Sequence, residues 1–257
     1  MTGFDVRAID LRALNSLTKY PSIPTYHRLD PRNGNLVEPA TAFDGPVIAT
    51  EKVDGTNSRI IVLPDGTYLL GSREELLYAK GDLIGNPSQG IVENLRPLAD
   101  RLPAGDRARV YYLELYGAKI GGQAKQYSTR GAVGWRLFDV AVVDDLAARL
   151  AWPPQQISAW REGGGQTYLA EHELQPAADA AGVDLTPRLF TIDAAELPTD
   201  IEKMHGFLGE RLPRTLVALD DSGQGRAEGI VLRGPDRSVI AKARFQDYDR
   251  TLRRRSH

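Results

Sequence analysis

The sequence of 257 residues contains no cysteine, which excludes disulfides, thiolate metal sites and cysteine nucleophiles. It also lacks an apolar run long enough to cross a bilayer. Its first residues, Met1–Asp5, have neither the basic start nor the apolar stretch of a signal peptide. These absences fit a cytoplasmic, intracellular protein with no membrane partner. The formal net charge is only −2, so no global positive field indicates a large nucleic-acid footprint.

What is present is the composition of an ordinary globular protein, with 42% hydrophobic and 26% charged residues. The length suits one large domain or two small ones. Apolar spacing predicts helices over 91–101, 171–181 and 199–211. Other runs are typical of strands, namely 110–116, 136–143, 229–233 and 238–244. Mixed elements with mostly short connections predict an α+β fold with antiparallel sheets.

The most informative run is Glu51-Lys52-Val53-Asp54-Gly55-Thr56-Asn57. The flanking segments 46–50 and 59–63 have the pattern of a strand and its returning partner, with Asp54-Gly55 as the turn of a hairpin. Lys52 is then held at a strand end beside glycine backbone that a ligand can approach closely. A lysine amine in such a place is a candidate nucleophile. The alternative is an ordinary hairpin with a solvent-facing lysine.

Further stretches follow in the chain: one short polar stretch, and four that combine apolar residues with a few polar or aromatic ones. They are Gly71–Glu74, Tyr112–Gly117, Trp135–Val140, Ala227–Arg233 and Ile240–Arg244. Taken singly, each has an ordinary interpretation. Glu114 and Glu228 would be exposed strand carboxylates, Phe138 a core residue and Arg73 a solvated turn residue. Lys242 and Arg244 share one face of a strand and would be a charged edge.

Taken together and in this order, these stretches resemble the motif series of the covalent nucleotidyltransferases, the superfamily of RNA ligases, DNA ligases and capping enzymes. Asn57 favours ATP-dependent RNA ligases of the RNA ligase 2 type, because DNA ligases and capping enzymes typically carry arginine at this place. Arg244 departs from the family pattern, which has a second lysine there. The resemblance implies a nucleotidyltransferase fold of two packed antiparallel sheets flanked by helices.

The resemblance also assigns roles to residues. It implies a catalytic set of Lys52, Glu228, Lys242 and Arg244. The implied ATP-binding set is Glu51, Lys52, Asn57, Arg73, Glu114, Phe138, Glu228, Lys242 and Arg244. Asn57 and Arg73 are the candidates that orient RNA ends. A divalent Mg²⁺ or Mn²⁺ is expected, held by Asp54 and Glu228 through water.

The activity that the resemblance implies has three steps and serves RNA repair. Lys52 attacks the α-phosphorus of ATP and retains AMP, the AMP moves to the 5′-phosphate of an RNA strand, and a 3′-hydroxyl then displaces it. Alternatives are a DNA ligase or capping-type nucleotidyltransferase, and a catalytically silent module that binds RNA or nucleotide. Nicked duplexes, tRNA breaks and single strands all remain open as substrates.

The expected organisation is a single nucleotidyltransferase domain over 1–257, with a helical insert at about 145–210. Because only 13 residues follow Arg244, we expect no C-terminal OB-fold or helical appendage. Capture of RNA ends would then be weak, or a partner protein would supply it. The basic tail, Arg250–Arg255, is either a solvated terminus or a phosphate contact.

Overall fold

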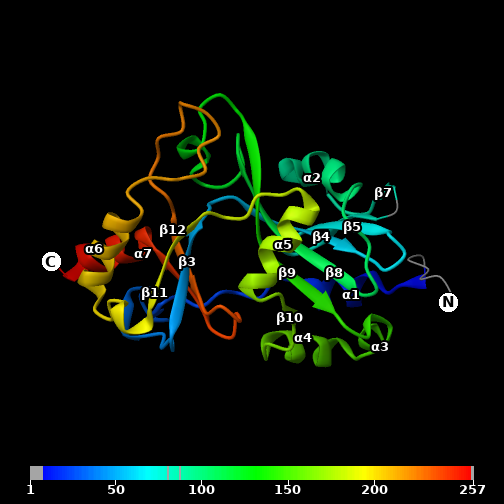
Figure 1. The fold of residues 1–257 in the computed structure, drawn as a ribbon, viewed down its shortest axis with the longest axis horizontal. Coiled ribbons are helices and arrows are strands. Elements are labelled where there is room, and N and C mark those ends of the chain that lie inside the picture. Colours follow the sequence, from blue (N-terminus) through cyan, green and yellow to red (C-terminus); the bar gives the residue numbers. More distant parts are fainter. Residues whose placement is uncertain (1–7, 80, 87, 256–257) are drawn as a thin grey trace. The chain divides into compact units, whose positions relative to one another are not determined.

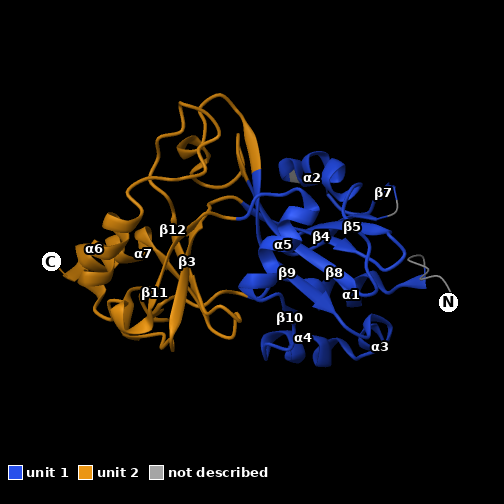
Figure 2. Ribbon diagram, viewed as in Figure 1, with its two compact units in different colours: residues 1–21, 56–115, 135–185 blue, residues 22–55, 116–134, 186–257 orange. Residues whose placement is uncertain are grey.

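The computed structural model of the chain describes residues 8–79, 81–86 and 88–255 (Figure 1). It divides into two compact units that both draw on distant parts of the sequence (Figure 2). Unit 1 comprises residues 1–21, 56–115 and 135–185. Unit 2 comprises residues 22–55, 116–134 and 186–257. Each unit is built around its own sheet.

Unit 1 is organised on a seven-stranded sheet with the strand order β10-β9-β8-β4-β5-β6-β7. In chain order these strands are β4 (Thr56–Val62), β5 (Tyr68–Ser72), β6 (Leu76–Ala79), β7 (Asp82–Leu83), β8 (Ala108–Gly117), β9 (Val133–Val143) and β10 (Thr167–Tyr168). The accompanying helices are α1 (Leu11–Thr18), η2 (Ser88–Gly90), α2 (Ile91–Ala99), α3 (Leu146–Leu150), α4 (Pro154–Glu162) and α5 (Glu171–Ala181). Strand β4 runs antiparallel to both β5 and β8.

A buried arginine ties α1 to this sheet. Arg59 of β4 is fully buried, and its guanidinium donates to the backbone and side-chain oxygens of Asn15. Burial lowers the pKa of Arg59 to about 10. Gly71 on the neighbouring strand gives this side chain its room, since an added Cβ would lie 2.8 Å from Arg59 Nε. The Arg59 contact therefore holds helix α1 against the sheet of unit 1.

Unit 2 is organised on a four-stranded antiparallel sheet with the order β11-β3-β12-β13. These strands are β3 (Pro46–Lys52), β11 (Arg188–Asp193), β12 (Gly229–Arg233) and β13 (Ile240–Arg244). The unit also contains the two-stranded pair β1 (His27–Leu29) and β2 (Leu36–Ala40). Its helices are η3 (Ala124–Gln126), η4 (Ala194–Glu196), α6 (Ile201–Arg211) and α7 (Phe245–Arg255).

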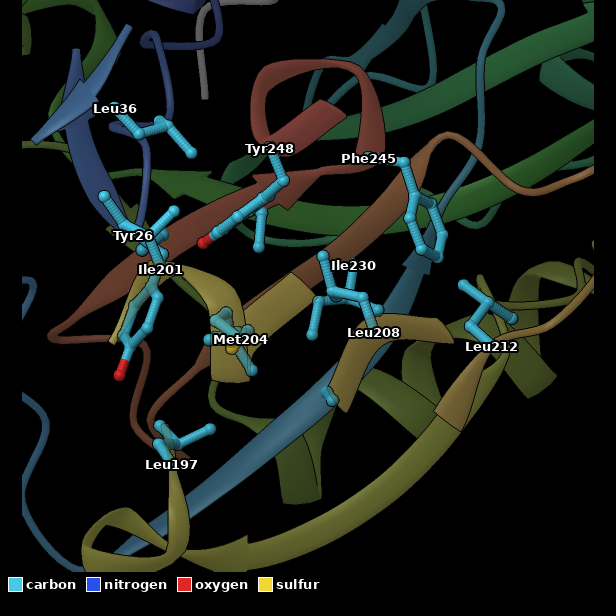
Figure 3. Packing of buried hydrophobic residues seen from close by; sticks show 14 of the residues in the cluster. Tyr26, Leu36, Leu197, Ile201, Met204, Leu208, Leu212, Ile230, Phe245 and Tyr248 are labelled. Carbon is cyan, nitrogen blue, oxygen red and sulfur yellow. The ribbon is translucent and has the colours of Figure 1, made fainter. Parts of the chain in front are cut away.

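The two faces of the four-stranded sheet differ in character because side chains alternate along each strand. One face carries the apolar core of unit 2, in which Ile230 of β12 packs with Met204 and Leu208 of α6 and Tyr248 of α7 (Figure 3). The register places the charged residues Lys52, Lys242 and Arg244 on the opposite face. The core thus determines where the charges must lie.

The helices predicted over 91–101, 171–181 and 199–211 correspond to α2, α5 and α6, and the strands predicted at 229–233 and 238–244 to β12 and β13. The hairpin predicted around Asp54-Gly55 was wrong. Strand β3 pairs with β11 and β12, whereas β4 pairs with β5 and β8, so the two strands belong to different sheets. Both strands are buried over most of their length, and each is central in its sheet with two partner strands.

Residues 145–210 contribute to both units, with α3, α4, β10 and α5 in unit 1 and β11, η4 and α6 in unit 2. The basic tail forms the end of α7, where Arg250 donates to the carbonyl of Gly34 and Arg254 to that of Asn33. No helix within the described residues is long and apolar enough to span a membrane.

Candidate active site

Lys52 is the last residue of β3, and its amine forms a close ion pair with Glu228. The Lys52 Nζ to Glu228 Oε2 distance is 2.5 Å. The lysine side chain is 23% exposed and the glutamate 9%, so the pair is shielded but reachable from solvent. Glu228 lies immediately before β12, which pairs directly with β3. Sheet pairing between segments 176 residues apart therefore creates the contact.

Gly229 separates Lys52 from Arg244 in the row of residues that crosses the sheet. It pairs with Lys52 on one side and with Arg244 on the other. A Cβ added at Gly229 would lie 2.1 Å from the carbonyl oxygen of Ala243, so β12 and β13 approach too closely here for any side chain. Because Gly229 has no side chain, only backbone atoms lie between Lys52 and Arg244 in this row. Arg244 Nη1 lies 4.0 Å from Glu228 Oε1.

Lys242 occupies the same face of the sheet, opposite Val231 of β12. Its side chain is half-buried. The backbone of Lys242 also bonds to the segment before β1, accepting from Tyr26 N at 2.8 Å and donating to Pro24 O at 2.8 Å. These bonds hold the strand end that carries both basic residues. Lys52, Lys242 and Arg244 thus lie on one sheet face in two neighbouring rows.

The turn after Lys52 is fixed by the segment 117–128. The backbone N–H of Asp54 donates to the Tyr127 hydroxyl at 2.5 Å, and Asp54 Oδ2 accepts from Gln123 N at 3.0 Å. Tyr127 is fully buried, and burial raises the pKa of its hydroxyl, which stays neutral. Gly121 packs on the same turn, where its added Cβ would lie 3.1 Å from Gly55 Cα. The lysine is therefore followed by a rigid turn.

Glu51 points to the other face of β3 and is only 1% exposed. Its carboxylate accepts from the Thr215 hydroxyl at 2.5 Å and from the backbone N–H of Leu216 at 2.8 Å. Both oxygens are thus used within unit 2. Charge-assisted bonds of this kind compensate a buried carboxylate for its lost water. Glu51 anchors the segment 215–216 against the strand that ends in the nucleophile candidate.

In unit 1, Asn57 of β4 and Glu114 of β8 are direct cross-strand partners. Side chains at such positions lie on the same face, with Cβ atoms about 5 Å apart. Asn57 Oδ1 is buried and accepts no hydrogen bond within the described residues. A buried acceptor without a partner costs free energy. Such acceptors are typical of sites where a ligand or an ordered water supplies the missing hydrogen bond. The predicted nucleotide contacts Asn57 and Glu114 therefore lie together.

Phe138 of β9 lies in an aromatic group of unit 1. Its ring is 6.3 Å from that of Tyr112, nearly parallel to it, and 5.0 Å from that of Tyr20, edge-on. The Tyr20 hydroxyl donates to Asp139 Oδ2 at 2.8 Å, which fixes Tyr20 against Phe138. The Phe138 side chain is half-buried and can present ring surface to a flat ligand.

Arg73 follows β5 in the turn 72–75, and its side chain is half exposed. Its Nε lies 3.6 Å from Glu74 Oε1. Arg73 is thus placed at the end of the strand next to the one that carries Asn57.

The predicted metal contacts are two carboxylates, Glu228 and Asp54. Across the described ranges, no group of three or more histidines and acidic residues gathers to hold a metal ion. Glu228 is paired with Lys52, and the Asp54 carboxylate accepts from the backbone N–H of Gln123. Two carboxylates are too few to enclose a metal ion. They suit a Mg²⁺ or Mn²⁺ ion that keeps most of its water ligands and is bound together with phosphate groups.

Three residues of the site were not identified from sequence. Tyr127 and Thr215 act through contacts to Asp54 and Glu51 that only the tertiary structure creates, and no local pattern marks them. Asp247 pairs with Arg244 at a spacing of three residues. Opposite charges three apart at the start of a helix are a signal that charge patterning could have revealed.

Comparisons with known proteins agree with the predicted resemblance. A model of the family described as RNA ligase matches residues 45–245, well over half of the chain. No curated protein matches the sequence.

Among solved structures, an RNA ligase from Naegleria gruberi determined with ATP and manganese has a TM-score of 0.53 and 14% identity, covering 83% of this chain and 52% of that one. A second structure of that ligase, with AMP and manganese, has a TM-score of 0.54 and 15% identity, covering 89% and 62%. The chain therefore spans only 52% to 62% of the length of these relatives. The superpositions confirm the predicted fold of helices and antiparallel sheets.

Proposed function

The chain belongs to the RNA ligase family, and from this premise we propose that it is an ATP-dependent RNA ligase that works through a lysine–AMP intermediate on Lys52. The observation that carries the proposal is the row Lys52–Gly229–Arg244, with Glu228 in contact with the amine. A nucleophile, an acceptor for its proton and a cation for the phosphate lie within one small part of unit 2. The two units together are proposed to form one nucleotidyltransferase domain.

In the first step the Lys52 amine forms a bond to the α-phosphorus of ATP, and the bond from this phosphorus to the bridging oxygen breaks. The electron pair leaves with pyrophosphate. The ammonium of the ion pair must first lose a proton, and Glu228 Oε2, at 2.5 Å, is an acceptor already in contact. Arg244 and Lys242 are proposed to hold the phosphate as negative charge grows on it. A divalent ion bound to the phosphates would neutralise charge on the leaving pyrophosphate.

The remaining roles extend the family resemblance to individual positions. Glu114 is proposed to accept from the ribose of the nucleotide, and Phe138 to stack on the purine. Asn57 and Arg73 are proposed to orient the RNA ends. Asp54 and Glu228 would contact the metal through water. Glu51 would contribute to ATP binding by holding the segment 215–216 in place.

In the later steps the lysine–AMP bond is exchanged for a bond between AMP and the 5′-phosphate of an RNA strand. A 3′-hydroxyl of a second end then attacks that phosphate, and AMP leaves. The polymeric substrate is therefore a pair of RNA ends, one carrying the phosphate and the other the hydroxyl.

The proposal is tested by incubating the protein with ATP labelled on the α-phosphate and a divalent metal. We expect covalent label on the wild-type protein and none on Lys52→Ala. Lys203→Ala, which removes an exposed lysine of α6, is the matched control and should keep the label. Equal labelling of the Lys52 variant would refute the assignment of the nucleophile.

Two further measurements separate related activities. Labelling by GTP in preference to ATP would indicate a capping-type enzyme. Ligation of nicked and single-stranded ends, compared between RNA and DNA, identifies the polymer. ATP binding without release of pyrophosphate would instead indicate a catalytically silent module.

A further inference from the structure

Arg244 stands at the junction between a strand and a helix. It is the last residue of β13, and α7 begins at the next residue, Phe245. The backbone N–H of Phe245 donates to the carbonyl oxygen of Glu228 at 3.0 Å. The first turn of α7 is therefore tied to the residue that contacts the Lys52 amine.

Asp247, in this first turn, is only 1% exposed and holds Arg244 by two bonds. Arg244 Nε lies 2.8 Å from Asp247 Oδ2, and Arg244 Nη2 lies 3.2 Å from Asp247 Oδ1. Such a two-point contact between a planar guanidinium and a carboxylate fixes orientation as well as distance. A second arginine, Arg250, bonds to Asp247 Oδ1 at 2.9 Å. Both oxygens of the buried carboxylate are thus engaged by cations.

The carboxylate cannot move easily, because the neighbouring residues of α7 are fixed in the core. Phe245 and Tyr248 are buried among the apolar residues of unit 2 (Figure 3). The Tyr248 hydroxyl lies 2.7 Å from His27 Nδ1, and the Thr251 hydroxyl accepts from the backbone N–H of Leu36 at 2.9 Å. Asp247 is therefore a fixed point from which the Arg244 side chain is held.

This arrangement determines which edge of Arg244 faces the candidate active site. Nε and Nη2 are used by Asp247, so Nη1 is the group near Glu228, at 4.0 Å from Oε1. The direct contact of the Glu228 carboxylate is with Lys52, whose Nζ lies 2.5 Å from Oε2. An arginine without this restraint would reach the Glu228 carboxylate directly, since opposite charges so close in a shielded site attract strongly.

We propose that Asp247 is a positioning residue for lysine adenylylation: it holds Arg244 with its Nη1 edge toward the phosphate that Lys52 attacks, and keeps Nη1 at 4.0 Å from Glu228, too far for a direct hydrogen bond. The inference deepens the proposed function and depends on it. Asp247 touches neither the nucleotide nor the amine and acts only through Arg244.

The test is single-turnover labelling with α-labelled ATP, in which the rate constant and the final amplitude are measured separately. A positioning role predicts that Asp247→Asn slows the rate constant roughly tenfold to a hundredfold, because a small misplacement of a charge-stabilising group has effects of this size. A role in folding alone would lower the amplitude, the fraction of active protein, and leave the rate constant unchanged.

Arg250→Gln is the matched control, because it removes the other arginine on the same carboxylate without disturbing the Arg244 contact. We expect a lower unfolding midpoint and an unchanged rate constant. Arg244→Lys completes a double-mutant cycle with Asp247→Asn, because the ammonium group of lysine cannot make the two-point contact with the carboxylate. It should be slow by itself, and adding Asp247→Asn to it should cause no further loss of rate constant.

A wild-type rate constant for Asp247→Asn, or losses that multiply in the double variant, would overturn the inference while leaving the proposed function intact. If Asp247→Asn does not fold, Asp247→Glu keeps the charge and displaces it by one methylene. A slow rate constant at full amplitude then supports the inference, and a wild-type rate constant overturns it. A wild-type protein that takes no label refutes the proposed function and this inference together.

Discussion

The substitution Gly229→Ala tests the geometry of the candidate site most directly. The new Cβ would lie 2.1 Å from Ala243 O and 2.8 Å from Arg244 Cα, both of them backbone atoms that cannot rotate away. Strands β12 and β13 must separate by about 1 Å before the shorter contact reaches 3.0 Å. The separation occurs in the row that holds Lys52 and Arg244, so it changes the distance between the two cations.

We expect this substitution to lower the free energy of unfolding by about 1–3 kcal/mol, the usual cost of overpacking. We expect the rate constant for lysine adenylylation to fall roughly a hundredfold, because a misplacement of 1 Å has effects of this order. Unfolding in urea and single-turnover labelling measure the two quantities. The control is Gly206→Ala in α6, where an added Cβ meets nothing within 4 Å and should stabilise the helix by about 0.5–1 kcal/mol. A folded Gly229→Ala protein that labels at the wild-type rate would refute the proposed role of this row.

Three further outcomes follow from contacts around the site. Tyr127→Phe removes the acceptor of the Asp54 N–H and should lower the free energy of unfolding by about 1–3 kcal/mol and slow labelling, both compared with wild type. Thr215→Val removes one of the two hydrogen bonds to the buried Glu51 carboxylate and should lower the free energy of unfolding, measured in urea, by about 1.5–3 kcal/mol. An unchanged midpoint of urea unfolding would contradict the anchoring role of Glu51. Removal of divalent ions with EDTA should abolish labelling without changing the unfolding midpoint, whereas a large drop in that midpoint would indicate a metal that the fold itself requires.

The sequence alone was sufficient to predict those features that depend on local patterns of residues. The strands around residues 230 and 242 and the helix at 201–211 follow from apolar periodicity, and the structure contains them as β12, β13 and α6. The ordered motifs were enough to predict the fold and the family, and both predictions are confirmed. The roles of the individual site residues remain predictions, although the register places Lys52 and Arg244 in one row and Asn57 beside Glu114.

The sequence was insufficient where a strand has distant partners. Asp54-Gly55 has the composition of a hairpin turn, yet β3 pairs with strands that begin at residues 188 and 229, and β4 with the strand that begins at 108. Turn chemistry is local, whereas the choice of partner strand depends on cross-strand contacts with segments that lie far away in the sequence. For the same reason the roles of Tyr127 and Thr215 could not be assigned, because they are set by neighbours from other segments.

The position of the cationic row is best understood as a consequence of the core behind it. Ile230, Leu232, Ala241 and Ala243 face the core of unit 2, and alternation then requires Lys242 and Arg244 to face the other way. A shift of one residue in the pairing of β13 would bury both charges in the core and expose two alanines. The free energy of that exchange is prohibitive, since an unpaired charge in an apolar core costs several kcal/mol. Hydrophobic burial on one face of the sheet therefore fixes the register, and the register fixes the separation of Lys52 and Arg244 along their common row.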